Sequence, residues 1–66
     1  MIVYMGDWIK VKNQWRQVVD LHPPTESFAV LNADGENEWW GTDTPEVYKG
    51  HLSNNEMQAK LREAGL

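Results

Sequence analysis

The chain contains no cysteine, and this absence excludes disulfides, thiolate metal ligands and cysteine nucleophiles together. It also has no apolar run long enough to span a bilayer. Residues 1–7 lack the basic region and the apolar core of a secretion signal. We therefore expect a cytoplasmic protein that has no membrane partner, and a reducing compartment fits a chain without cysteine.

Length leaves room for a single domain, which we place at residues 1–66. A domain of this size buries only about 60% of the surface of its unfolded chain. Four tryptophans stand in this short sequence. Each indole buries a large area, so aromatic side chains compensate for the small core.

Charge is distributed unevenly in this small acidic protein, whose formal net charge is −4. Residues 8–17 contain Lys10, Lys12 and Arg16 but no acid, whereas residues 18–48 contain acids and no Lys or Arg. Such asymmetry can steer a charged partner. It can equally belong to solvated strand faces, and that simpler reading is the favoured one.

Apolar and polar residues alternate with a period of two near the N-terminus, which predicts strands over residues 8–12 and 15–21. We expect Asn13-Gln14 to form the turn between them. Val18 beside Val19 interrupts the alternation, and a bulge or strong bend there would let both valines reach apolar surroundings. The predicted core comprises Ile9, Val11, Val19, Leu21, Phe28 and Val30.

Further strands are predicted over residues 27–32 and 37–42, joined by the turn former Asp34-Gly35. Because side chains alternate along a strand, Trp39 and Trp40 must then point to opposite faces. Pro45 is suited to the first position of a single helical turn. A short fifth strand follows within residues 48–52.

A C-terminal helix is the strongest local prediction, over about residues 54–64. Ser53 and Glu56 have the spacing of a capping box, and Gly65 is a suitable stop. Met57 and Leu61 begin a narrow apolar stripe, completed by Ala64. The stripe can pack on the chain's own strands or on a partner, and the first alternative is favoured.

These elements resemble the SH3-like small barrels, including the Tudor and KOW types, over about residues 6–52. The resemblance depends on residues 6–11 and 15–19 and on Trp40, Pro45, Gly50 and His51. It implies a mainly β fold, an SH3-like barrel of four to five antiparallel strands at about residues 2–52 with the C-terminal α-helix. The spacing is also similar to short uncharacterised proteins of actinobacteria and their phages. SH3-like barrels have many unrelated binding functions, so the resemblance implies no reaction.

Catalytic and cofactor motifs are lacking. The histidines His22 and His51 and the serines Ser27 and Ser53 stand in no recognisable catalytic arrangement. Two distant histidines without cysteine are a weak basis for a metal site, and no glycine-rich phosphate loop occurs. We expect a non-enzymatic protein with no cofactor, no metal and no small-molecule substrate.

Tryptophan in excess of what the core needs is the main functional signal, because exposed aromatic patches usually mark interaction sites. Trp8 is expected to be exposed, opposite Ile9, and by alternation one of Trp39 and Trp40 is expected to be exposed as well. The candidate partner-binding residues are Trp8, Lys10, Lys12, Trp15, Arg16, Trp39 and Trp40. The preferred hypothesis is a protein–protein interaction module that binds a protein partner or a second copy, and a phage-encoded modifier of a host protein would be one such role. Equally weighted is the structural explanation that Met57, Leu61 and Leu66 of the helix cover this face.

A nucleic-acid-binding barrel is the alternative hypothesis. Its tryptophans, Trp8 and Trp15, would stack on bases, and its cations, Lys10, Lys12 and Arg16, would contact phosphates. Three cations on an acidic chain give weak electrostatic attraction to a polyanion, so this alternative is the less favoured.

Overall fold

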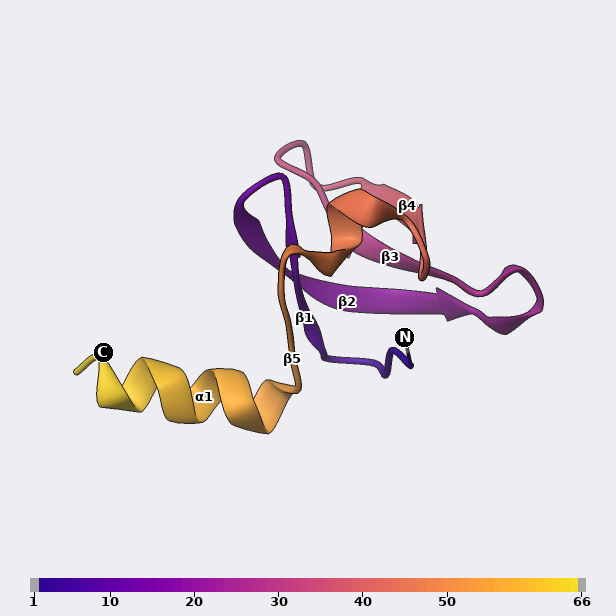
Figure 1. Cartoon of the computed structure of the whole chain (residues 1–66). Coiled ribbons are helices and arrows are strands. Elements are labelled where there is room, and N and C mark those ends of the chain that lie inside the picture. Colours follow the sequence, from indigo (N-terminus) through magenta and orange to yellow (C-terminus); the bar gives the residue numbers. More distant parts are fainter. Residues whose placement is uncertain (1, 66) are drawn as a thin grey trace.

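One antiparallel sheet and a C-terminal helix form the computed structural model, which describes residues 2–65 and only the backbone of Glu46 and Tyr48. The strand order is β4-β3-β2-β1-β5 (Figure 1). The elements are β1 (Trp8–Val11), β2 (Gln14–His22), the 3₁₀ turn η1 (Pro23–Thr25), β3 (Ser27–Leu31), β4 (Asn37–Gly41), the 3₁₀ turn η2 (Pro45–Lys49), β5 (His51–Leu52) and α1 (Asn54–Glu63).

The prediction of a mainly β chain with five antiparallel strands and a C-terminal helix is confirmed. Within residues 2–65, the edge strands β4 and β5 are not paired with each other, so the sheet is open. Closure of the predicted barrel is therefore not confirmed. In the same part of the chain, no helix is long and apolar enough to cross a membrane.

The turn between β1 and β2 lies one residue earlier than predicted. Val11 already pairs with Gln14, so the two turn residues are Lys12 and Asn13. Their φ angles are 51° and 66°, as a two-residue type I′ turn requires. Asparagine adopts the left-handed backbone readily, so Asn13 indicates a turn in the sequence. Lysine seldom adopts it, so the sequence does not indicate that Lys12 belongs to the turn.

The predicted bulge in β2 is confirmed, since the pairing with β3 shifts between Val18 and Asp20. The extra residue is Val19, and it reverses which face the following side chains occupy. Val18 and Leu21 therefore both point inward, and only 2% of Val18 is exposed. The prediction of Val19 in the core was wrong, because Val19 is half-buried on the other face.

Four of the remaining predicted core residues are buried, Leu21 is partly buried and packs against them, and η2 adds one core residue that the sequence did not predict. Ile9, Val11, Phe28 and Val30 are inaccessible or nearly so. Val47 joins them from η2, which packs on β1. The 3₁₀ turn η2 thus adds an apolar side chain to the core on the side where the edge strands β4 and β5 do not pair with each other.

Trp39 and Trp40 point to opposite faces of β4, as predicted. Trp40 lies opposite Phe28 and packs against the core, with its indole N–H donating to Glu38 Oε1 at 2.8 Å. The prediction that one of these two tryptophans is exposed is confirmed, because Trp39 is 48% exposed. The prediction of an exposed Trp8 was wrong, because Trp8 is half-buried.

Helix α1 begins at the predicted capping box and then extends away from the sheet (Figure 1). The Glu56 N–H donates to Ser53 Oγ at 3.2 Å, and the Ser53 N–H donates to Glu56 Oε1 at 3.3 Å. Met57 is buried, whereas Leu61 is 37% exposed. Leu66 lies outside the described residues. Only the first turn of the helix is therefore fixed to the sheet by a buried side chain.

This arrangement predicts that the two apolar residues of α1 contribute very differently to stability. Met57→Ala is expected to lower the free energy of unfolding by about 2 kcal/mol, because a buried side chain is removed. Leu61→Ala is the matched control on the same face and should change it by less than about 0.5 kcal/mol. Urea unfolding followed by tryptophan fluorescence measures both. Equal losses would mean that the whole helix packs on the sheet.

A buried carboxylate joins the N-terminal turn to the last strand. Asp7 is 5% exposed, and its Oδ2 accepts hydrogen bonds from the Tyr4 N–H at 3.0 Å and from His51 Nε2 at 2.8 Å. The Asp7 backbone also accepts from the Val18 N–H at 2.7 Å. His51 thus helps to hold β5 beside β1.

Candidate interaction surface

The pairing of β1 with β2 brings four of their side chains to the face of the sheet opposite the core. Trp8 lies opposite Gln17, and Lys10 lies opposite Trp15. Directly paired residues on antiparallel strands share a face. Since Ile9 alternates with Trp8 and Lys10 and is fully buried, these four side chains form the outer face. The Lys10 ammonium lies 6.0 Å from the centre of the Trp15 ring.

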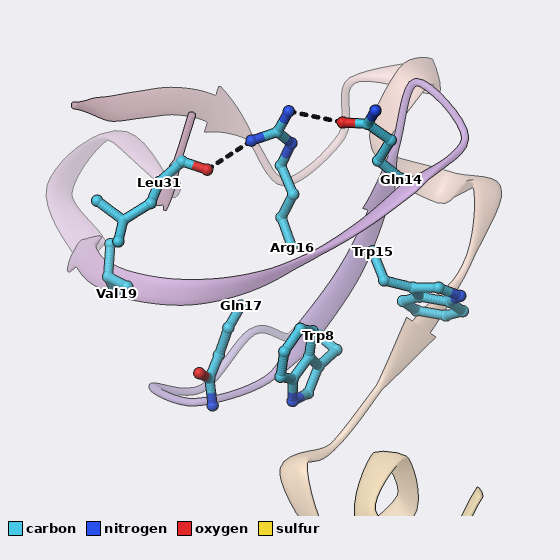
Figure 2. A pocket seen from close by; sticks show the side chains of 7 residues that line it. All are labelled: Trp8, Gln14, Trp15, Arg16, Gln17, Val19 and Leu31. Atoms are coloured by element: carbon cyan, nitrogen blue, oxygen red, sulfur yellow. Dashed lines mark hydrogen bonds between the residues drawn. The ribbon is translucent and has the colours of Figure 1, made fainter. Parts of the chain in front are cut away.

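A shallow depression of about 360 Å³ occupies this region, and we call it the Trp8–Trp15 depression. Val19 reaches it because of the bulge, and Leu31, which is 47% exposed, comes from β3. Figure 2 shows the Trp8 and Trp15 rings on one side of β2 and the Arg16 guanidinium on the other. The residues that line the depression are Trp8, Gln14, Trp15, Arg16, Gln17, Val19 and Leu31.

Both indoles of the depression are held in place by the rest of the fold. The Trp8 indole N–H donates to Asn54 Oδ1 at 3.2 Å, at the start of α1. Trp15 lies against the backbone at Gly50, where an added Cβ would come within 2.9 Å of its ring. The Gly50 carbonyl in turn accepts from the Lys10 N–H at 2.9 Å. The glycine therefore contacts the ring and also extends the pairing of β1 with β5.

The guanidinium of Arg16 is held at the edge of the depression by two hydrogen bonds (Figure 2). One N–H donates to the Leu31 carbonyl at 2.6 Å, and another donates to Gln14 Oε1 at 2.8 Å. Two bonds to a planar group fix its orientation. Since guanidinium has five N–H donors, further donors remain for a ligand.

The seven residues predicted to bind a partner are not gathered in one place. Trp8, Trp15 and Arg16 line the depression, and Lys10 lies beside it. Lys12 instead lies over Trp40, with its ammonium 5.3 Å from the ring centre.

Trp39 belongs to a separate depression of about 330 Å³ that it shares with His22, Thr25 and Ser27. The His22 and Trp39 rings meet edge to face with their centres 6.4 Å apart. The contributions of Trp39 and of the Trp8–Trp15 depression to partner binding can therefore be tested separately.

Sequence reasoning missed four residues that line the Trp8–Trp15 depression. Gln17 could have been found, because the predicted hairpin pairs it with Trp8 once the turn is placed correctly. Val19 was assigned to the core, and no local signal brings Gln14 or Leu31 to the site. Among the side chains that the structure describes, no three His, Asp or Glu residues are grouped as a metal site would require. No protein family, curated protein or solved structure matches this chain.

Proposed function

We propose that this chain is a non-enzymatic protein–protein interaction module that binds its partner at the Trp8–Trp15 depression. The observation that carries the proposal is an outer sheet face bearing two indoles and Leu31, which is 47% exposed. The solvent face of an antiparallel sheet is ordinarily polar. The two indoles are half-buried and Leu31 is exposed, so this face presents apolar surface to solvent. Apolar surface patches mark interaction sites, and Trp is enriched among the residues that dominate binding energy.

An SH3-like architecture is part of the proposal. Its support is the strand order, in which β1 lies between β2 and β5, together with the 3₁₀ turn η2 between β4 and β5. Val47 of η2 fills the core where the two edge strands do not pair. We infer a partly open barrel whose gap is covered by this turn.

A nucleic-acid partner has weaker support from the positions of the cations. A single-stranded ligand needs cations that follow its backbone beside the stacking rings. Lys10 shares the outer face with the indoles, but Arg16 projects to the other side of β2. Lys12 lies over Trp40, which belongs to the inner face. The three cations therefore do not form one track, and the net charge of −4 adds repulsion.

Affinity capture with the immobilised chain tests the proposal. We expect a discrete protein to be retained from a cell extract with or without nuclease, and to be lost with Trp8→Ala and with Leu31→Ser. Trp39→Ala is the matched control, because it removes an exposed indole outside the depression. Thermal melting of each variant shows whether it is folded. Loss of the partner with Trp39→Ala alone, or with nuclease, would contradict the proposed surface.

A further inference from the structure

We infer that the outer edge of β4 pairs with β4 of a second copy of this chain, in an antiparallel two-fold arrangement centred on Trp39. This surface is separate from the Trp8–Trp15 depression. β4 lies at the edge of the sheet, and its register against β3 is regular from Asn37 to Gly41 (Figure 1). Open strand edges pair with further strands unless a lysine, a proline or a bulge protects them, and β4 contains none of these.

Hydrogen bonds just beyond the two ends of β4 determine which of its main-chain groups face the open edge. At one end the Thr42 N–H donates to the Glu26 carbonyl at 3.0 Å, and at the other the Asn32 N–H donates to the Glu36 carbonyl at 2.8 Å. Bonded pairs alternate along antiparallel strands, so the even-numbered residues of β4 bond to β3. The odd-numbered residues direct their N–H and carbonyl groups outward, and they are Asn37, Trp39 and Gly41.

Most of this outward edge is open to a partner. The Gly41 carbonyl accepts from the Thr44 N–H at 3.2 Å. Among the residues that the structure describes, no loop residue hydrogen-bonds to the outward groups of Asn37 or Trp39. The 3₁₀ turn η2 packs on β1. Because Trp39 is also 48% exposed, its indole is accessible together with its main chain.

Side-chain charges favour the register in which Trp39 lies opposite Trp39 of the second copy. Glu38 then lies opposite Trp40 of the second copy, where the Lys12 ammonium is 5.3 Å from the centre of the ring. Each Glu38 therefore meets a cation of the other copy. The neighbouring register, which pairs Asn37 with Trp39, would place two Glu38 side chains opposite each other, and directly opposed like charges are destabilising.

A second copy fits this edge because the two-fold pairing is complementary to itself. The Trp39 N–H of each copy donates to the Trp39 carbonyl of the other, and the Gly41 N–H donates to the Asn37 carbonyl. The two Trp39 indoles share one face of the joined sheet, and aromatic residues at opposed positions stabilise paired strands. The contact is short, so we expect a reversible dimer and not an obligate one.

Sedimentation velocity at rising protein concentration, together with amide hydrogen exchange, tests the inference on the intact chain. We expect a monomer–dimer equilibrium in which the amides of Trp39 and Gly41 become protected as concentration increases. The neighbouring register would protect Asn37 and Trp39 instead. Trp8→Ala is the matched control, because it alters the separate depression and should leave the dimer unchanged.

Two sets of variants separate main-chain pairing from side-chain charge. Trp39→Pro removes the outward N–H at an edge position, where proline is tolerated, and should abolish the dimer, whereas Trp39→Ala keeps the N–H and should weaken it less. Glu38→Lys opposes like charges at two symmetric positions and should weaken the dimer about tenfold. Adding Lys12→Glu should restore it, a rescue that a purely structural role would not produce. Thermal melts show which variants are folded.

Three outcomes would overturn the inference. The first is a chain that stays monomeric at concentrations up to about 1 mM. The second is a dimer that persists with folded Trp39→Pro, or one that is lost with Trp8→Ala, which would place the contact at the depression. The third is assembly into rings or chains larger than a dimer, which would require β4 to pair with a different edge. If Trp39→Pro does not fold, the exchange pattern of the unmodified chain still decides the result.

Discussion

Phe28→Ala is expected to lower the free energy of unfolding by about 3–5 kcal/mol, because it empties the centre of the core. Phe28 is the largest of the fully buried side chains, and it lies opposite Leu21 and Trp40 on the neighbouring strands. A domain of this length has a total stability of only about 3–10 kcal/mol. The variant should therefore lose about half or more of the total stability, as circular dichroism and urea titration would record.

Two further variants keep this expectation testable. Phe28→Leu retains most of the volume and should cost less than about 1.5 kcal/mol, so its unfolding curve can be measured in full. Leu31 is on the same strand but on the outer face. The Leu31→Ala substitution should therefore change the free energy of unfolding by less than about 0.5 kcal/mol. A loss at Leu31 as large as that at Phe28 would mean that the outer face is packed in solution.

Asp7→Ala is expected to lower the free energy of unfolding by about 2–3 kcal/mol, the second largest effect that we predict. The substitution removes the acceptor of the Tyr4 N–H and of His51 Nε2, and hydrogen bonds to a charged group contribute about 1.5–3 kcal/mol. Asp7→Asn retains a carbonyl oxygen in the same place and should cost less. Urea unfolding followed by fluorescence measures both variants.

Combining Asp7→Ala with His51→Ala tests whether the two side chains act together. Because their atoms are 2.8 Å apart, the double variant should be destabilised by less than the sum of the two single variants. Strict additivity would show that Asp7 stabilises the fold through the Tyr4 turn alone. His51→Ala by itself should cost less than Asp7→Ala, since the Tyr4 bond persists.

Local patterns predicted most of the elements from the sequence. Alternation identified β1 to β4, Ser53 and Glu56 marked the start of α1, and the paired valines located the bulge. What local patterns could not decide was which valine is the extra residue, because Val18 and Val19 are chemically identical. That choice depends on the register with β3, which involves residues distant in the sequence.

The remaining differences have similar nonlocal causes. Val47 is buried because η2 folds back on β1, and no periodicity in a five-residue turn reveals this. Lys12 adopts φ 51° because the strands on both sides of the turn require it. Closure of the sheet depends on edge strands that lie at opposite ends of the sheet order.

The candidate site was predicted less completely than the fold. Trp8, Lys10 and Trp15 do lie together, because they follow from the hairpin register. Proximity in the sequence also groups Arg16 and Lys12 with them, but the Arg16 guanidinium lies at the edge of the depression on the other side of β2, and Lys12 lies over Trp40. Leu31 reaches the depression through the bend of β2, which sequence spacing does not specify.

The contact between Trp15 and Gly50 gives position 50 control over a surface that it does not line. A side chain there would meet the indole at 2.9 Å and the Lys10 Cβ at 3.3 Å. The backbone of the same residue carries the carbonyl that receives the Lys10 N–H. A side chain at position 50 would therefore disturb both the wall of the Trp8–Trp15 depression and the pairing of β1 with β5, so the shape of this surface and the edge of the sheet are constrained by one residue.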